Sequence, residues 1–346
     1  MGPGLSPLLS QQSLELLVGA GFQHPRIVGS WVAITVQPEL PMAIDSDHSR
    51  AWRSAPVGIV GLGLIGGSIA LDLRRHGVRV QALVHRAETA ERARQRGLAD
   101  LVSTDAAVLS DCALVVLALP LDRLLEPDPA LVAAIPEQAV LTDVGSVKQP
   151  VLEVWQRLHE RFVASHPMAG TAQAGVEAGV EGLFAGRPWV ATPSEQTEPG
   201  ALACVQDLAA LLGSRWLCCP AADHDQAVAL ISHLPVLVSA ALLQTADRAA
   251  AMADGGSSGT LGNLVRALAS SGFADTTRVG GGNPVLGTLM ARSNRTAVQQ
   301  ALEVYRQALG AMEEQLSAGD WAALEADLRQ AARLRPQFVL TDRSAG

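Results

Sequence analysis

The sequence predicts an α/β protein whose N-terminal part is a doubly wound parallel sheet and whose C-terminal part is all helical. Three observations lead to this prediction. A glycine-rich turn joins an apolar strand to a helix near residue 60, short apolar runs follow it at regular intervals, and long helical patterns fill the chain after residue 200. Alternating strands and helices are typical of parallel sheets that helices cover on both faces.

The composition is that of a globular protein that binds small molecules. Hydrophobic residues make up 48% of the 346 residues and charged residues 17%, which indicates a large core. The net charge of −8 and the lack of a basic run argue against nucleic-acid binding. Four cysteines without zinc-site spacing predict reduced thiols in a cytoplasmic protein and no metal site. No apolar stretch reaches the length of a transmembrane helix, about 20 residues, so we expect no membrane span.

We expect four segments along the chain. Residues 1–54 are rich in Gly and Pro and predict a loosely ordered extension without the features of a signal or transit peptide. Residues 55–195 predict the domain with the parallel sheet, and residues 196–338 predict the helical domain. Residues 339–346 predict a short tail.

The glycine-rich turn has the pattern and context of a dinucleotide-binding motif. An apolar strand over 57–60 precedes the run GLGLIG (61–66), and a helix and a second strand follow. Gly61 permits the tight turn, Gly63 lets a pyrophosphate approach the backbone, and Gly66 lets the helix pack on the strand. Free N–H groups at the helix start then bind the phosphates, which predicts a Rossmann-type domain. The cofactor contacts expected from this motif are Gly61, Gly63, Leu64, Ile65 and Gly66.

The end of the second strand predicts which cofactor is bound. NAD-binding proteins place Asp or Glu there, about 20 residues after the glycines, on the ribose 2′-hydroxyl. This chain has HRAET (85–89) instead. The guanidinium of Arg86 can pair with a 2′-phosphate, which favours NADP, whereas Glu88 keeps NAD open and Arg86 could be an ordinary surface residue. The further cofactor contacts expected are His85, Arg86, Thr89 and, in the strand that follows, Leu119.

Three more apolar runs complete the predicted sheet, at 112–120, 139–144 and 161–165. His166 follows the last of them and Pro167 restricts its backbone. We therefore expect its ring at the carboxyl end of a strand of this sheet, where α/β proteins bind ligands. Lys148, the only lysine in the chain, follows the neighbouring strand. Its ammonium is suited to a ligand carboxylate or a ribose hydroxyl.

The C-terminal part predicts long apolar helices. One begins with Asp223 as its N-cap and carries a kink at Pro235. Further helices are predicted over 284–318 and 320–334. These helices are too apolar for a lone bundle, so we expect a homodimer interface, with a self-contained monomer as the alternative.

Five motifs occur in a specific order: GLGLIGGS (61–68), TDVGSVK (142–148), SHPMAGT (165–171), ADHDQAVALISHLP (222–235) and SSGFADTTRVGGGNP (270–284). Together they resemble the prephenate/arogenate dehydrogenase family of tyrosine biosynthesis, over about residues 56–335. The likeness is to the cyanobacterial arogenate dehydrogenases in particular, which use NADP. It implies a Rossmann-type domain followed by a helical dimerisation domain.

The resemblance also implies a reaction and a site. The substrate is a cyclohexadiene with a ring hydroxyl opposite a carboxylate and a three-carbon side chain, and it loses hydride and carbon dioxide to become aromatic. By resemblance, His166 is the general base that takes the hydroxyl proton, and Ser146 hydrogen-bonds this histidine and the hydroxyl. Arg278 is implied to bind the ring carboxylate. The substrate contacts expected are Thr171, Gln173, His224, His233, Arg278 and Lys148, although His233 is equally typical of a core histidine.

Two departures from the family pattern bear on the substrate. Many members that use prephenate have a histidine where this chain has Val236 and an acidic residue where it has Ala172. The changes leave the keto side chain of prephenate with one donor fewer, which favours arogenate and the product L-tyrosine. Prephenate, giving 4-hydroxyphenylpyruvate, stays the alternative substrate. A catalytically silent NADP-binding regulator stays the alternative function.

Overall fold

The computed structural model describes residues 50–171, 173–253 and 260–338. Ala172, the tail 339–346 and all but the end of the expected extension lie outside these residues. The end of the extension is ordered. Ala51–Ser54 form a short 3₁₀ helix, and Trp52 and Arg53 donate hydrogen bonds to Asp207 of helix α8 (Pro199–Leu211), at 3.1 and 2.8 Å.

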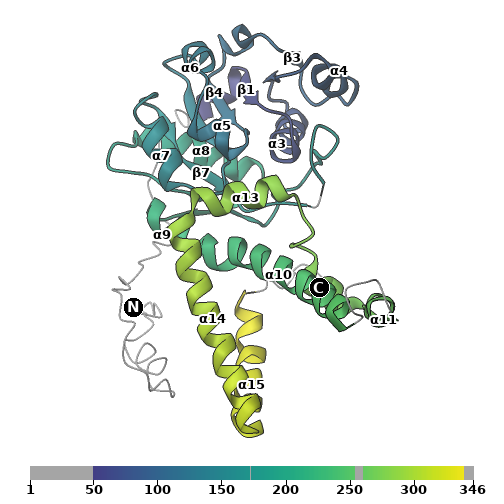
Figure 1. The fold of residues 1–346 in the computed structure, drawn as a ribbon. Helices are drawn as coiled ribbons and strands as arrows, with labels where there is room; N and C mark the ends of the chain where they lie inside the picture. The colour runs from purple at the N-terminus through teal and green to yellow at the C-terminus, as the bar shows by residue number, and fades with distance from the viewer. Residues whose placement is uncertain (1–49, 172, 254–259, 339–346) are drawn as a thin grey trace, which may run out of the picture. The chain divides into compact units, whose positions relative to one another are not determined.

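The N-terminal part contains a six-stranded sheet in the order β3-β2-β1-β4-β5-β6, with every neighbouring pair parallel (Figure 1). This is the doubly wound order that the sequence predicts. The strands are β1 (Val57–Val60), β2 (Val80–Leu83), β3 (Leu101–Ser103), β4 (Leu114–Leu117), β5 (Val140–Asp143) and β6 (Phe162–Val163). The helices between them are α3 (Leu64–Arg75), α4 (Ala87–Gln95), η2 (Ala106–Leu109), α5 (Leu121–Leu125), α6 (Pro129–Ala134) and α7 (Gln149–Trp155).

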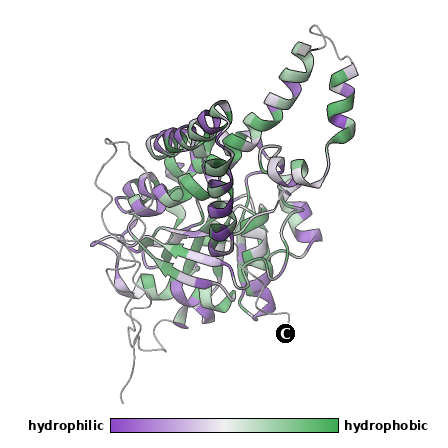
Figure 2. Ribbon diagram, turned by 90° about the horizontal axis from the view of Figure 1, so that it is seen from below, coloured by the Kyte–Doolittle hydropathy of each residue, from purple (hydrophilic) through white to green (hydrophobic). Residues whose placement is uncertain are grey.

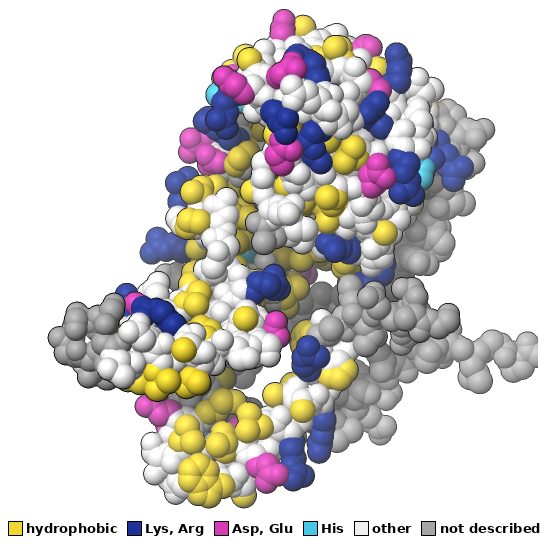
Figure 3. All heavy atoms as spheres, turned by 90° about the vertical axis from the view of Figure 1, so that its right-hand side faces the viewer, with side chains coloured by type: hydrophobic (Ala, Val, Ile, Leu, Met, Phe, Trp, Pro, Cys, Tyr) yellow, Lys and Arg dark blue, Asp and Glu magenta, His cyan; other side chains and the backbone are white. Residues whose placement is uncertain are grey.

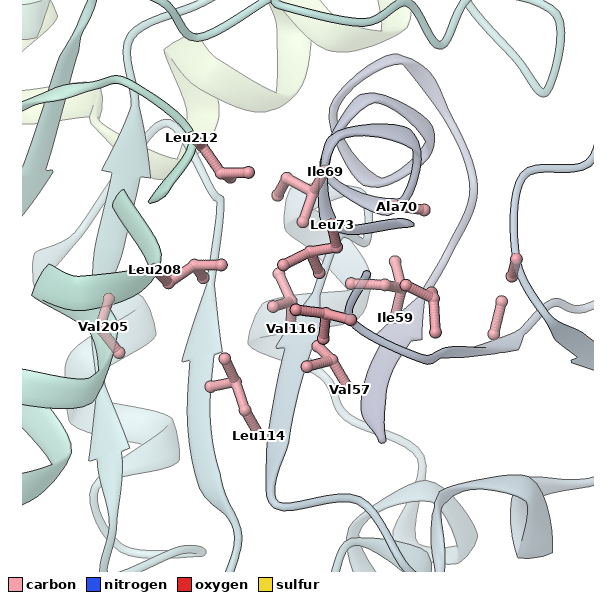
Figure 4. Packing of buried hydrophobic residues seen from close by; sticks show 14 of the residues in the cluster. Val57, Ile59, Ile69, Ala70, Leu73, Leu114, Val116, Val205, Leu208 and Leu212 are labelled. Carbon is pink, nitrogen blue, oxygen red and sulfur yellow. The ribbon is translucent and has the colours of Figure 1, made fainter. Parts of the chain in front are cut away.

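Helices cover both faces of this sheet because its strands are apolar on both sides. In β4, Leu114 and Val116 belong to one buried cluster, and Val115 and Leu117 belong to another. Successive strand residues point to opposite faces, so a continuous apolar run fits a strand covered twice. Figure 4 shows the first cluster, in which side chains of β1, α3, β4 and α8 meet.

A second, three-stranded sheet changes the expected position of His166. Its strands are β7 (Ser165–Pro167), β8 (Pro188–Ala191) and β9 (Arg215–Cys218), and His166 pairs with Val190 across antiparallel strands. The sequence predicts that His166 lies at the end of a strand of the parallel sheet. The parallel sheet ends at Val163, however, and His166 lies within β7. Only Ala164 separates the two strands, which brings this histidine close to the carboxyl ends all the same.

Helix α8 and strand β9 belong with the sheets rather than with the C-terminal helices. Val205 and Leu208 of α8 lie in the buried cluster with β1 and β4 (Figure 4), and β9 pairs with β8. The change to an all-helical structure therefore comes after β9, and not at residue 196 as expected. An apolar helix that covers a sheet and one that pairs with other helices have similar compositions, which explains the difference.

In the described residues of the C-terminal part, a single helical run extends from residue 221 to residue 253, and five helices follow it. The run consists of α9 (Ala221–Val228), the π-helix η3 (Ala229–His233) and α10 (Leu234–Ala253). The π turn lies directly before Pro235. Asp223 lies in the first turn of α9 and Pro220 occupies the N-cap position, contrary to the prediction. The other helices are α11 (Thr260–Leu268), α12 (Ser271–Thr277), α13 (Pro284–Ser293), α14 (Arg295–Ala318) and α15 (Trp321–Phe338).

Many hydrophobic side chains of these helices are exposed. Figure 2 shows hydrophobic residues along the helices as well as in the sheet, and in Figure 3 they gather on the lower, helical part. By length and composition alone, the run Ala221–Met252 could cross a membrane, because it contains an 18-residue window with a mean hydropathy of 1.9. A helix that packs against a second protein chain has the same properties. The most exposed of the large hydrophobic residues are Met252, Leu268, Val285, Trp321 and Phe338, each with a relative solvent exposure of 64% or more.

Candidate active site

The glycine turn leaves space for a ligand at one of its three glycines. Gly61 has φ +94°, and a Cβ there would lie 2.5 Å from the carbonyl oxygen of Ala118. A Cβ on Gly66 would lie 2.0 Å from the carbonyl oxygen of Gly61. A Cβ on Gly63, by contrast, would meet nothing within 4 Å. Packing inside the protein therefore requires two of the glycines, while the third keeps an open surface at the start of α3.

The start of α3 suits a phosphate group. Gly63 is the N-cap residue, so no side chain caps the helix, and the first turn carries no acidic residue. The first N–H groups of a helix lack partners within the helix and carry partial positive charge. Leu64 and Ile65, the first two helical residues, are partly buried against the core cluster. This end of the helix can receive the pyrophosphate of a dinucleotide.

The residues expected to contact the ribose lie after β2 and in α4. His85 and Arg86 follow β2 and are exposed, and Thr89 in α4 is partly buried. Within the described residues, the Arg86 guanidinium has no ion pair, although Arg92 and Arg94 of the same helix each have one. An exposed, unpaired guanidinium at this point can bind a 2′-phosphate.

The neighbouring parallel strands β1, β4 and β5 end at the same edge of the sheet. Leu119 follows β4 and is partly buried, and its Cδ2 would lie 3.5 Å from a Cβ on Gly61. Ser146 follows β5 and is also partly buried. Neighbouring parallel strands have their carboxyl ends at one edge, where the strand order reverses between β1 and β4, and ligands bind at this point in doubly wound sheets.

His166 is hydrogen-bonded to another histidine and not to Ser146. Its Nδ1 lies 2.9 Å from Nε2 of His224, and the two rings meet edge to face with centroids 5.2 Å apart. No hydrogen bond between Ser146 and His166 occurs among the described residues, which differs from the expectation. Burial, with smaller contributions from His224 and Lys148, holds the pKa of His166 well below its usual value. The ring is therefore neutral at pH 7 and able to accept a proton.

The carboxylate of Asp225 continues this contact. Nδ1 of His224 lies 2.8 Å from Oδ1 of Asp225, and both side chains are buried. The same carboxylate accepts hydrogen bonds from the backbone N–H groups of Lys148, at 2.7 Å, and Gln149, at 2.9 Å. Helix α9 thereby caps the start of α7, and the C-terminal part is tied to the sheet beside the expected base. Burial lowers the pKa of His224, and the hydrogen bond to Asp225 opposes this shift.

Lys148 lies inside the protein core. Its side chain is fully buried, and its ammonium donates to the carboxylate of Asp143 and, at 2.7 Å, to the carbonyl oxygen of Ser165. Burial lowers the pKa of Lys148, and Asp143 opposes the shift. The prediction that this lysine contacts a substrate is therefore wrong. Its ammonium instead holds the backbone immediately before His166. The Asp143 carboxylate also accepts from the backbone N–H of Ser165, at 3.1 Å.

His233 has one ring nitrogen without a partner. The Asn294 side-chain amide donates to the carbonyl oxygen of Asp225, at 2.7 Å, and lies 3.3 Å from Nδ1 of His233. An NH₂ group can only donate, so Nδ1 accepts and the ring proton is on Nε2. Nε2 is buried and has no partner in the described structure. Burial lowers the pKa of His233 to about 4, so the ring is a neutral hydrogen-bond donor.

Thr171 and Gln173 are exposed and lie in the loop after β7. The backbone N–H of Gln173 donates to Oγ1 of Thr171, at 3.2 Å, and neither side chain contacts His166 within the described residues. The next part of the loop is attached to the nucleotide-binding helices. Arg92 of α4 pairs with Glu177, and the Ser68 hydroxyl in α3 accepts from the N–H of Val180, at 3.0 Å.

Arg278 follows α12 and is exposed. Its neighbours fix the backbone, because Thr277 is buried and the N–H of Gly280 donates to the Ser239 hydroxyl of α10, at 2.8 Å. A Cβ on Gly280 would lie 2.3 Å from the backbone nitrogen of Ala240, so α10 requires glycine there. In the described residues, Arg278 has no ion pair and no hydrogen bond with His166, His224 or His233.

Three residues of the site were not predicted from the sequence. Asp225 lies in the ADHD motif, next to His224, and this adjacency was the available signal. Asn294 interrupts the helix predicted over 284–318, and no pattern marks it as polar and buried. Asp143 ends β5, and its pairing with the only lysine depends on a contact across the core.

Two family models match the chain. Residues 69–218 match the nucleotide-binding domain of prephenate dehydrogenase, and residues 220–330 match its dimerization domain. The boundary between the two matches lies between β9 and α9. The structure changes from sheets to helices at the same point.

Individual proteins and solved structures agree with these matches. A prephenate dehydrogenase of Bacillus subtilis (strain 168) is 30% identical over 66% of this chain, which spans 61% of that protein. A cyclohexadienyl dehydrogenase of Zymomonas mobilis is 31% identical over 71% of this chain and 83% of its own length. The crystal structure of Synechocystis arogenate dehydrogenase is 41% identical with a TM-score of 0.69, over 82% of this chain and 100% of that one. In the crystal structure of prephenate dehydrogenase from A. aeolicus in complex with hydroxyphenyl propionate and NAD+, the protein is 27% identical to this chain. The TM-score is 0.74, and the match covers 82% of this chain and 98% of that one.

Proposed function

From the premise that this chain belongs to the prephenate dehydrogenase family of oxidoreductases, we propose that it is an arogenate dehydrogenase that uses NADP. The reaction is the oxidative decarboxylation of L-arogenate to L-tyrosine. The observation that carries the proposal is the neutral, partly buried His166, which follows directly on Ser165, a residue hydrogen-bonded to Asp143 at the carboxyl end of β5.

The residues present fit a dinucleotide. The open position at Gly63 and the uncapped start of α3 suit its pyrophosphate. At the ribose, the exposed Arg86 favours a 2′-phosphate, because a guanidinium and a phosphate form charge-assisted hydrogen bonds of about 1.5–3 kcal/mol each. When bound, NADP accepts the hydride that leaves the hydroxyl-bearing carbon of the substrate.

The chain's own residues perform the proton transfer and the orientation. An alcohol proton is too weakly acidic to leave unaided, and a positioned base contributes about 10²–10⁴-fold in rate. His166 takes this proton at Nε2, since its Nδ1 is already hydrogen-bonded to His224. We propose that Ser146 contacts the substrate hydroxyl from the end of β5. Loss of carbon dioxide then makes the ring aromatic, and this step needs no further group.

Arg278 and His233 are proposed to hold the substrate's other groups. Arg278 pairs with the ring carboxylate, which orients the substrate without taking part in the loss of carbon dioxide. His233 offers Nε2–H to a polar group of the substrate. Thr171 and Gln173 line the same pocket from the loop after β7.

The choice of arogenate over prephenate rests on two supports. The chain has Val236 where many users of prephenate have a histidine, which removes a donor to the keto side chain. It is also 41% identical to the Synechocystis arogenate dehydrogenase. Prephenate is the second candidate, because the family matches and the Bacillus relative carry that name.

We further propose that the enzyme is a cytoplasmic homodimer. The region 220–330 matches a dimerization domain, and the exposed apolar side chains of α10 to α15 need a cover. A second copy of the chain supplies it. The four cysteines are free thiols, which is typical of a reducing compartment.

A matrix of two substrates against two cofactors tests the proposal. We expect the highest kcat/KM with arogenate and NADP+. A clear preference for prephenate would overturn the proposal that arogenate is the substrate. If neither cofactor is reduced with either substrate, the proposal that the protein is a dehydrogenase is wrong. Arg86→Asp should reverse the cofactor preference. The matched variant Arg79→Asp, at the other end of β2, should leave this preference unchanged.

A further inference from the structure

We propose that Asp225 and His224 are positioning residues that decide which ring nitrogen of His166 carries a proton. The inference rests on the proposed role of His166 as the base. It concerns a chain of three side chains, in which each hydrogen bond fixes the direction of the next. The result is that Nε2 of His166 keeps its lone pair.

The direction of the chain starts at Asp225. Its carboxylate accepts from two backbone N–H groups and faces Nδ1 of His224 at 2.8 Å. A carboxylate can only accept, so the proton of a neutral His224 must be on Nδ1. Nε2 of His224 is then an acceptor.

The second hydrogen bond transfers this direction to the base. Nδ1 of His166 lies 2.9 Å from the acceptor Nε2 of His224, so Nδ1 of His166 carries the proton. A neutral imidazole has one proton, and Nε2 therefore has none. Without the chain, the proton could occupy either nitrogen, and the tautomer with Nε2–H cannot act as a base toward the substrate.

The same chain stabilises His166 after it has taken the proton. The imidazolium then donates from Nδ1 to His224, whose other nitrogen faces the negative Asp225. Among the described residues, the other groups that influence the pKa of His166 are Lys148, whose charge Asp143 offsets, and the neutral His233. Asp225 carries the negative charge at the end of this hydrogen-bond chain, and among the described residues it has no ion pair with a lysine or an arginine.

Asp225 also has a structural task, which a test must separate. Its carboxylate caps α7 through the N–H groups of Lys148 and Gln149, so a substitution at Asp225 affects folding as well as the histidines. His224 makes no such backbone contact with its ring. Variants of His224 therefore test the hydrogen-bond chain while Asp225 still caps α7.

Glutamine and leucine at position 224 form a matched pair. The side-chain amide of His224→Gln can donate to Asp225 and accept from His166, so the direction of the chain is kept. Leucine is similar in size but has no polar atom. We expect kcat to stay within about tenfold of the wild type in His224→Gln and to fall by about 10²-fold or more in His224→Leu.

Asp225→Asn tests the charge, with Asp223→Asn on the same helix as the control. Removing the negative charge beside the histidines should move the acid limb of kcat/KM to lower pH, by about one unit. It should also lower the pKa of His166 in the protein without substrate. That titration is followed by NMR of the ¹³C-labelled histidine ring. Asp223→Asn should change neither quantity.

The outcomes separate this inference from the proposed function. If His224→Leu has the kcat of His224→Gln, or if Asp225→Asn and Asp223→Asn give the same acid limb and the same His166 titration, the chain does not position the base. If the wild type is inactive but the His166 titration still shifts in Asp225→Asn, the proposed function is contradicted. The hydrogen-bond chain from Asp225 to His166 is then still supported. If Asp225→Asn lowers kcat but leaves the acid limb of kcat/KM at the pH of the wild type, Asp225 acts through folding alone and the inference is wrong.

Discussion

The side-chain amide of Asn294 lies 3.3 Å from Nδ1 of His233, at the junction between α13 and α14. The helices do not continue into each other because Asn294 has φ −117° and ψ 36°. This break directs a buried amide toward α9 and η3. It also fixes the ring proton of His233 on the nitrogen that has no partner among the described residues.

Asn294→Leu should weaken substrate binding. Leucine has a similar size but cannot hold the Nε2–H tautomer of His233, so the donor to the substrate is lost in part of the molecules. We expect KM for the substrate to rise by about tenfold, the equivalent of one hydrogen bond. Steady-state kinetics at saturating cofactor measures it.

The control is Asn283→Leu, at the start of the preceding helix. Asn283 caps α13 through the N–H groups of Val285 and Leu286, so its loss should cost about 1 kcal/mol of stability. KM should not change. An equal KM in Asn294→Leu and the wild type would mean that the tautomer of His233 is irrelevant to binding.

Lys148→Met should destabilise the protein rather than weaken substrate binding alone. Removing the ammonium leaves the Asp143 carboxylate buried without its cation, which costs about 3–5 kcal/mol. Denaturant unfolding measures the loss. The double variant Lys148→Met/Asp143→Asn should recover part of it, because the charge is then removed. A raised KM with unchanged stability would restore the role of Lys148 as a substrate ligand.

His166 predicts the pH dependence of turnover. Its pKa is lowered by burial, so the base is neutral and active at pH 7. As the pH falls through the lowered pKa, the ring gains a proton and activity is lost, which places the acid limb of kcat/KM below pH 6.5. His166→Asn should reduce kcat by about 10²–10⁴-fold and leave the Kd of NADP+ unchanged. An acid limb above the ordinary histidine pKa would contradict the buried, neutral base.

Two glycine variants separate cofactor binding from folding. Gly63→Ala places its methyl group in open space, so the protein should fold normally and bind NADP+ more weakly. Gly66→Ala places a methyl group 2.0 Å from the carbonyl oxygen of Gly61, so it should lower Tm. Thermal unfolding and nucleotide titration check both. Unchanged NADP+ affinity in Gly63→Ala would show that the pyrophosphate lies elsewhere.

The parallel sheet was predictable because its signals are local. The glycine turn and the apolar runs each fix one strand or helix, and their order fixes the sheet. The position of His166 was less predictable, since one residue, Ala164, separates the last parallel strand from β7. The end of the sheet depends on pairing with β8, which lies more than 20 residues further along the chain.

The contacts inside the site could not be derived from spacing. Lys148 looked available because it follows a strand, yet Asp143 and Ser165 enclose it in the core. His224 was expected to bind substrate, and its two nitrogens are instead occupied by His166 and Asp225. These contacts join α9 to β7 and Lys148 to β5 and β7, and tertiary packing alone determines them.

A crystal structure of the enzyme with NADP+ and the product tyrosine tests the central claim most directly. The phenol oxygen of tyrosine derives from the substrate hydroxyl and marks where the proton was taken. We expect Nε2 of His166 to lie within hydrogen-bond distance of this oxygen, about 2.6–3.2 Å. A ring of His166 turned away from the phenol, with another side chain bonded to that oxygen, would contradict it.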